Sequence, residues 1–228
     1  MKSLVSLMMA LMLSSAVYAQ KDVTTFLGIP VDGTKKEMKK KLIDKGFTYK
    51  ELAGHEYFEG EFNGTDVHLY IGTNNNKVYR IMLTDVANLD EANIRVRFNT
   101  LVRQFENNNR YMFCSKNYKI SDSEDISYEM TTHSKIYGAV FYQKPVSAKS
   151  DTAVCSQTNE KLLKDSLDNP AKEDTIDIGK RISAAMAAYA AAEKKTVWFK
   201  IVQFDNSNRY YIAMYYDNLY NQANGEDL

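Results

Sequence analysis

The chain has 228 residues, which is enough for one sizeable domain or two small ones, and its hydrophobic content of 44% suits a globular core. Its 29 basic and 29 acidic residues balance, so the composition gives no reason to expect a nucleic acid or another polyanion as partner. The three histidines show no metal-ligand spacing, which argues against a metal site.

The first 19 residues have the layout of a secretory signal peptide. Lys2 precedes an apolar run over 4–13, and Val17 and Ala19 place small side chains at the two positions that a signal peptidase reads. The run is about ten residues long, whereas a membrane-spanning helix needs roughly 20. We therefore expect a periplasmic or secreted protein that is cleaved near Ala19 and has no transmembrane segment in its mature chain.

Residues 20–88 predict a helix followed by an antiparallel meander. Thr34 and Glu37 are spaced as a capping box at the start of the helix, and Gly46 stands where a left-handed residue would end it. Asn63-Gly64 joins two alternating segments, HEYFEGEF and DVHLYIG, which is the pattern of a hairpin with a two-residue turn.

The register of this hairpin sorts its side chains into two faces. The core face carries Phe58, Phe62, Val67, Leu69 and Ile71. The other face carries Tyr57, Glu59, Glu61, Asp66, His68 and Tyr70, with Glu59 opposite His68. A three-residue loop over 74–76 keeps Tyr79, Ile81 and Leu83 of the third strand on the core face, and it places Arg80 beside Tyr70 and Met82 beside His68.

Residues 89–145 predict a second unit that begins with a helix. Apolar residues recur there at helical spacing, namely Ile94, Phe98, Leu101, Val102 and Phe105. The segment DISYEMTTHSKIYGAVFYQ, over 125–143, then predicts a second hairpin. Residues 146–177 are polar and rich in turn residues, so we expect a connecting segment with room for a short helix over 158–166.

Residues 178–228 predict a helix and a last hairpin. The helix carries one stripe of Ile178, Ile182, Ala185, Met186 and Tyr189. The strands TVWFKIVQF and RYYIAMYY meet around a four-residue loop, DNSN, which places Trp198 opposite Tyr215. The core face of this hairpin carries Val197, Phe199, Ile201, Ile212, Met214 and Tyr216, and the other face carries Trp198, Lys200, Val202, Tyr211 and Tyr215.

The order of these elements predicts an α+β fold, because the short connections are antiparallel and no strand–helix–strand alternation indicates a parallel sheet. We expect an antiparallel meander sheet with helices packed on one face and helix-plus-meander units in tandem.

A glycine at position 28, the segment DGTKKEMKKKL opening a helix, and a meander followed by a second helix and meander resemble proteins related to β-lactamase inhibitor protein. The pattern is also similar to the small outer-membrane assembly lipoproteins of that fold, and it covers about residues 23–142. The resemblance implies secreted or periplasmic proteins that bind through an open sheet face. Neither an inhibitory loop nor a lipoprotein cysteine is matched, so neither of those roles is implied.

The two cysteines predict one disulfide. Cys114 and Cys155 form an even pair in a chain that is expected to reach an oxidising compartment. The bond would close a loop of about 40 residues and stabilise the fold by roughly 3–4 kcal/mol. The alternative is a reactive free thiol, which no histidine close in the sequence supports.

The aromatic content is the most informative functional signal, with 16 tyrosines and one tryptophan. The inferred registers place several of them on the sides of strands that face away from the core. Trp and Tyr offer a large rigid contact area with a polar tip and recur at interaction surfaces. We therefore expect a non-enzymatic protein that binds an envelope protein or a glycan. The expected binding residues are Trp198, Tyr211, Tyr215, Lys200, Tyr57, Tyr70, Arg80 and His68.

Two other interpretations stay open. A second layer of helix or loop would cover the aromatic side chains and leave a structural spacer. Alternatively, Glu59 and His68 would orient a base in an exported hydrolase with a dispersed active site, although the same pair is better explained as a polar contact between strands. The chain has no G-x-S-x-G, H-E-x-x-H, Walker or dinucleotide motif, so we predict no catalytic residue and no cofactor.

Overall fold

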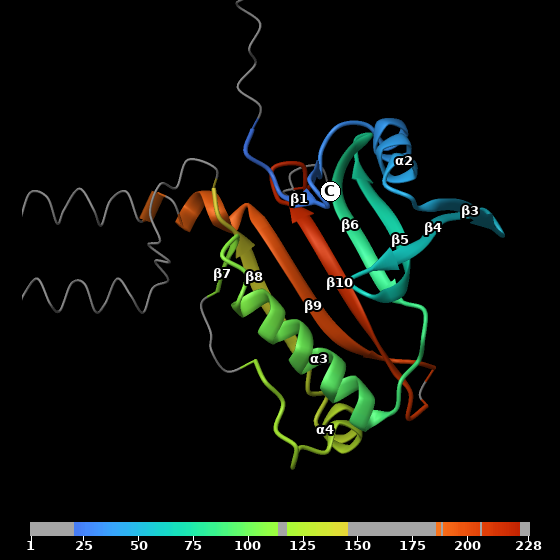
Figure 1. Ribbon diagram of the computed structural model, residues 1–228, viewed down its shortest axis with the longest axis vertical. Coiled ribbons are helices and arrows are strands. Elements are labelled where there is room, and N and C mark those ends of the chain that lie inside the picture. The colour runs from blue at the N-terminus through green and yellow to red at the C-terminus, as the bar shows by residue number, and fades with distance from the viewer. Residues whose placement is uncertain (1–20, 114–117, 146–185, 188, 206, 224–228) are drawn as a thin grey trace, which may run out of the picture.

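The computed structural model describes residues 21–113, 118–145, 186–187, 189–205 and 207–223. These residues form an eight-stranded antiparallel sheet, a small two-stranded sheet, and helices that lie against the large sheet (Figure 1). The large sheet has the strand order β3-β4-β5-β6-β10-β9-β8-β7. The predicted α+β fold with an antiparallel sheet is therefore confirmed.

The fold consists of two helix-plus-meander units, and their last strands pair with each other in the large sheet. The first unit contains β1 (Thr25–Phe26), β2 (Ile29–Pro30), α2 (Lys35–Asp44), β3 (Thr48–Leu52), β4 (His55–Phe62), β5 (Thr65–Asn74) and β6 (Lys77–Asp85). The second contains α3 (Glu91–Glu106), β7 (Tyr111–Met112), α4 (Ile126–Thr132), β8 (Gly138–Gln143), β9 (Lys195–Gln203) and β10 (Tyr210–Asn218). Pairing of β6 with β10 joins the two units in the middle of the sheet.

Two predicted hairpins are confirmed, β4–β5 near one edge of the sheet and β9–β10 in its middle. Asn63 and Gly64 both adopt positive φ, as the two central residues of a tight hairpin turn require. The turn pairs Phe58 with Leu69 and Glu59 with His68. The last hairpin pairs Trp198 with Tyr215. In each case the turn fixes which residues face the core.

The predicted three-residue loop after β5 is wrong. Asn75 and Asn76, both at positive φ, form a two-residue turn, and a β-bulge then shifts the register between Gly72 and Thr73. The bulge leaves Tyr79 as an extra residue in β6 and restores the alternation that the longer loop was expected to supply.

This bulge corrects the neighbours predicted for the third strand. Val78 is buried in place of Tyr79, whereas Ile81 and Leu83 keep their predicted positions in the core. Arg80 lies opposite Gly72 rather than Tyr70, and Met82 lies opposite Tyr70 rather than His68.

The predicted hairpin over 125–143 is also wrong, because its first half is the helix α4. Asp125 caps this helix by accepting a hydrogen bond from the backbone N–H of Tyr128 at 2.8 Å. The carboxylate of Glu91, at the start of α3, accepts the N–H groups of Ile126 at 3.0 Å and of Ser127 at 3.3 Å. N–H groups at the start of a helix need such acceptors, and here one comes from a residue 35 positions away.

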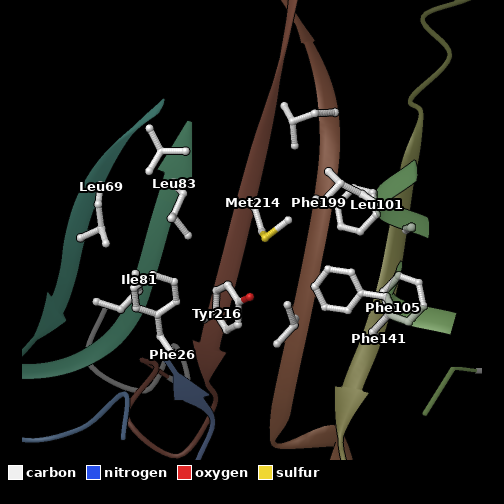
Figure 2. Close-up of a cluster of buried hydrophobic side chains, with 14 of the residues drawn as sticks. Phe26, Leu69, Ile81, Leu83, Leu101, Phe105, Phe141, Phe199, Met214 and Tyr216 are labelled. Carbon is white, nitrogen blue, oxygen red and sulfur yellow. The ribbon is translucent and has the colours of Figure 1, made fainter. Parts of the chain in front are cut away.

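The core lies between the large sheet and the helices. Figure 2 shows side chains of β5, β6, β10, β9 and β8 side by side across the sheet, with Leu101 and Phe105 of α3 packed against them. All five apolar residues of the predicted second helix are buried. Met38 and Leu42 of α2 and Ile126 of α4 belong to the same core, so these three helices cover one face of the sheet. No helix of the described residues is long and apolar enough to span a bilayer.

Several predicted features lie outside the described residues: the signal peptide, the connecting segment over 146–177, the short helix within it, and both cysteines. The predicted C-terminal helix is described only in part, since residues 186–187 and 189–193 are helical. Within it Met186 is exposed rather than packed on a stripe, and Ala192 is buried.

The lysine-rich helix α2 is anchored by a single carboxylate. The predicted capping box is present, since the Thr34 hydroxyl accepts from the N–H of Glu37 and the Glu37 carboxylate accepts from the N–H of Thr34. Lys35 lies 2.6 Å from a carboxylate oxygen of Glu56 on β4, and Lys39 contacts the other oxygen. Two of the five lysines of this helix therefore bind the sheet, whereas Lys36, Lys40 and Lys41 are exposed.

The Glu56 contacts predict a loss of stability in acid. Hydrogen bonds from Lys35, then Lys39, then Tyr49 lower the pKa of Glu56 from 4.5 to about 2. A carboxyl whose pKa is lower in the folded state stabilises the fold above its unfolded pKa, and that contribution disappears as the pH falls through the folded value. We expect the free energy of unfolding, measured in urea, to decline between pH about 4.5 and about 2.

The variant Glu56→Gln should flatten this part of the pH profile. The matched control is Glu61→Gln on the same strand, because Glu61 is exposed and forms no ion pair with a described residue. An unchanged acid limb in Glu56→Gln would show that other carboxylates cause the decline.

Candidate functional site

The eight predicted binding residues all lie on the side of the large sheet that faces away from α2, α3 and α4. We call this surface the aromatic face, defined by Tyr57, His68, Tyr70, Arg80, Trp198, Lys200, Tyr211 and Tyr215. Each is partly exposed, and along every strand these residues alternate with buried residues of the core. The helical residues 189–193 meet this side of the sheet at its β8 end, where the rings of Tyr189 and Tyr142 lie 6.0 Å apart.

The middle of the aromatic face is a cluster built around Asp217. Arg80 of β6 binds its carboxylate with two hydrogen bonds, of 2.6 Å from Nε and 2.8 Å from Nη2. The indole N–H of Trp198 on β9 donates to the same carboxylate at 2.8 Å. The rings of Trp198 and Tyr215 are stacked, with centroids 3.9 Å apart and planes at 11°. We call Arg80, Trp198, Tyr215 and Asp217 the seam cluster, because it spans the junction of the two units.

The guanidinium of Arg80 contacts aromatic rings as well as the carboxylate of Asp217. Its guanidinium carbon lies 5.0 Å from the centroid of Tyr215, 5.7 Å from Trp198 and 5.5 Å from Tyr79. These distances fall within the range in which a cation is attracted by a ring face. The hydrogen bonds to Asp217 raise the pKa of Arg80, and burial raises the pKa of Tyr215, so the tyrosine stays neutral at physiological pH.

Gly72 makes room for this arrangement. A Cβ at this position would lie 3.1 Å from the Cβ of Arg80 and 3.3 Å from the ring of Tyr79, which is tighter than ordinary contact. The glycine therefore leaves space for the side chains of both Tyr79 and Arg80.

A second aromatic group lies on β4 and β5. The ring of Tyr57 is 5.0 Å from the imidazole of His68 and 6.2 Å from the ring of Tyr70. Burial raises the pKa of Tyr70. Lys200 and Tyr211 occupy β9 and β10, where Lys200 lies opposite Ala213 and Tyr211 opposite Val202. The two groups and these two residues thus share one face across five adjacent strands.

The register predicted for Glu59 opposite His68 is confirmed, but the two side chains contact other partners. Glu59 lies opposite His68, yet its carboxylate is 3.5 Å from the ammonium of Lys50 and accepts from the Tyr57 hydroxyl at 3.5 Å. No hydrogen bond joins Glu59 to His68 among the described side chains. Within that part of the chain no three His, Cys, Asp or Glu residues are grouped as metal ligands.

Asp217 is the residue of the seam cluster that the sequence prediction missed. The last strand was expected to end at Tyr216, whereas β10 continues to Asn218. One more step of the same alternation, from Tyr211 through Ala213 and Tyr215, would have placed Asp217 on the aromatic face. The side chain of Asp217 is only 5% exposed, so it holds Arg80 and Trp198 in place and is too buried to contact a partner itself.

Over the residues that the structure describes, this is an α+β protein whose antiparallel sheet carries α2, α3 and α4 on one side and the partly exposed aromatic face on the other. No family model, no curated protein and no solved structure matches the chain.

Proposed function

We propose that this protein is an exported, non-enzymatic binding protein that holds an envelope protein against its aromatic face. The observation that carries the proposal is the seam cluster, in which a stacked Trp and Tyr flank an arginine that is fixed by a buried carboxylate. The proposal of export rests on the signal-peptide pattern of the first 19 residues.

The seam cluster has the properties of an interface anchor. Trp, Tyr and Arg are the residue types that most often dominate binding energy at protein interfaces. The hydrogen bonds to Asp217 and the ring stacking hold all three side chains in one arrangement before a partner arrives. Less conformational entropy is then lost on binding, which favours affinity.

The size of the aromatic face agrees with the centre of an interface. Its residues lie on five adjacent strands, which at the usual strand spacing cover about 19 Å across the sheet. A standard protein interface buries about 800 Å² on each partner, which requires a rim around such a centre. Polar neighbours on the same side, such as Glu59 and Thr196, can supply that rim. The resemblance to proteins related to β-lactamase inhibitor protein supports binding through this side, and it stays a proposal.

The proposal is tested by capture from the cell envelope of the producing organism. Immobilised protein should retain a partner identified by mass spectrometry, and the double variant Trp198→Ala/Tyr215→Ala should lose at least about 100-fold in affinity, because two anchor residues are removed. The matched control is Tyr128→Ala, which removes an exposed tyrosine of α4 on the opposite side of the sheet.

Treatment of the extract distinguishes the two partner classes. Loss of the partner after proteolysis supports a protein, whereas loss only after periodate oxidation of sugars points to a glycan and contradicts the proposal as stated. Equal capture by the protein and by the double variant, with circular dichroism showing both folded, would show that another surface binds.

A further inference from the structure

A cleft of about 850 Å³ opens on the other side of the sheet, at the end where the two-stranded sheet lies. Its walls are the turn between β1 and β2, the turn between β4 and β5, the C-terminal end of α3, and the paired ends of β7 and β8. The cleft is separate from the aromatic face, because the side chains of Phe62, Phe105 and Tyr216 that line it belong to the core side of the sheet or contact it.

Aromatic rings form the inner surface of this cleft. Tyr216 is almost fully buried, and the rings of Phe105 and Tyr111 meet edge to face with centroids 4.7 Å apart. Phe62 and Tyr111 are only partly buried, so they present ring surface to the cleft. Such a surface suits the apolar faces of a small organic ligand rather than a bare ion.

Two amide side chains, those of Asn63 and Gln104, line the cleft and bind each other. Asn63 donates from Nδ2 to Oε1 of Gln104 at 2.7 Å, which ties the β4–β5 turn to α3. The side-chain oxygen of Asn63 and the NH₂ group of Gln104 form no hydrogen bond with a described residue. One acceptor and one pair of donors are therefore held in place and available to a ligand.

The cleft also contains cations that lack a carboxylate partner. Neither the guanidinium of Arg110 nor the ammonium of Lys144 forms an ion pair within the part of the chain that the structure describes. The two residues are neighbours, since the N–H of Lys144 donates to the carbonyl of Arg110 at 2.9 Å.

A third cation is buried in the wall of the cleft. The side chain of Lys195 is 4% exposed, and its ammonium donates to Asp22 at 2.5 Å and to the carbonyl of Lys144 at 3.2 Å. An ammonium has three donors, so one donor of Lys195 has no acceptor among the described residues. The charged lining is then three cations against two acids, Asp22 and Glu61.

We propose that this cleft is a second binding site and takes a small, polar ligand that carries a carboxylate. Arg110 and Lys144 bind the carboxylate, Asn63 and Gln104 bind hydroxyl or amide groups of the ligand, and the rings of Phe62 and Tyr111 contact its apolar face. A uronic acid and the C-terminal carboxylate of a peptide share this chemistry. The site does not depend on the proposed function of the aromatic face.

The test measures binding to the purified full chain by calorimetry with two matched pairs of probes. Digalacturonate is compared with neutral galactobiose, and acetyl-dialanine is compared with its C-terminal amide. We expect at least one acid to bind and its neutral counterpart to bind at least about tenfold more weakly, since a charge-assisted hydrogen bond is lost. The pair that shows the difference identifies the source of the carboxylate.

Variants then assign the site. Arg110→Gln/Lys144→Gln should weaken binding of the acid by at least about tenfold, whereas Lys36→Gln/Lys40→Gln removes the same charge from exposed positions of α2 and should leave binding unchanged. Trp198→Ala/Tyr215→Ala should also bind the acid normally, which separates this site from the aromatic face. The proposal is overturned if neither acid binds at about 10 mM, if the neutral probes bind equally well, or if the Arg110/Lys144 variant binds as the parent does.

Discussion

Replacement of Asp217 by alanine is expected to lower the free energy of unfolding by about 3–5 kcal/mol. The change removes the partner of the Arg80 guanidinium and leaves the Trp198 N–H without its acceptor. A charge that loses its only close counter-charge in a partly buried site costs far more than the pair itself contributes. Urea unfolding followed by tryptophan fluorescence reports both effects, because Trp198 is the only tryptophan of the chain.

Two further variants separate charge from hydrogen bonding. Asp217→Asn keeps an acceptor for Trp198 and should cost less than Asp217→Ala. The double variant Arg80→Met/Asp217→Leu removes both charges at once and should recover much of the lost stability, as replacements of buried ion pairs by apolar residues do. If Arg80→Met/Asp217→Leu is as unstable as Asp217→Ala alone, the isolated charge is not the cause.

Truncation of Phe199 to alanine should lower the free energy of unfolding by about 3–5 kcal/mol, because it opens a cavity that the surrounding rings cannot close. Phe199 is fully buried, and the centroid of its ring lies 5.3 Å from that of Phe98, 5.6 Å from Phe105 and 6.0 Å from Phe141. Figure 2 shows Phe199 beside Phe105 and Phe141. Denaturant titration measures the loss directly, with an unchanged slope showing that the folded state stays compact.

The control for this variant is Phe204→Ala. Phe204 follows the same strand and is 48% exposed, so the same truncation there should change the free energy of unfolding by less than about 0.5 kcal/mol. A comparable loss from both variants would indicate that aromatic truncation acts on the unfolded chain rather than on the core.

Local patterns predicted the faces of the sheet well. The Asn63-Gly64 turn and the alternation around it were sufficient to assign Tyr57, His68 and Tyr70 to one side, because a tight turn leaves one register. The last hairpin assigned Trp198 and Tyr215 in the same way. All eight predicted binding residues lie on the expected side, Arg80 through the bulge rather than through the predicted loop.

Features that depend on distant contacts were not predictable. The start of helix α4 is stabilised by the Glu91 carboxylate of α3, which accepts hydrogen bonds from its first N–H groups. The sequence around Ile126 alone predicts a strand. The two-residue turn and the bulge at Tyr79 place Arg80 opposite Gly72 rather than Tyr70. The ion pair between Arg80 and Asp217 joins residues 137 positions apart, and no turn sets the register between β6 and β10. The seam cluster therefore could not be derived from local spacing.

Because the seam cluster spans both units, it forms only when both units have folded and paired. Arg80 comes from the first helix-plus-meander unit, whereas Trp198, Tyr215 and Asp217 come from the second. Neither unit alone carries all four side chains, so a truncated chain or one cut between the units and separated cannot present the assembled anchor. A partner that recognises this anchor would select intact molecules over fragments, and its binding energy would in turn hold the two units together.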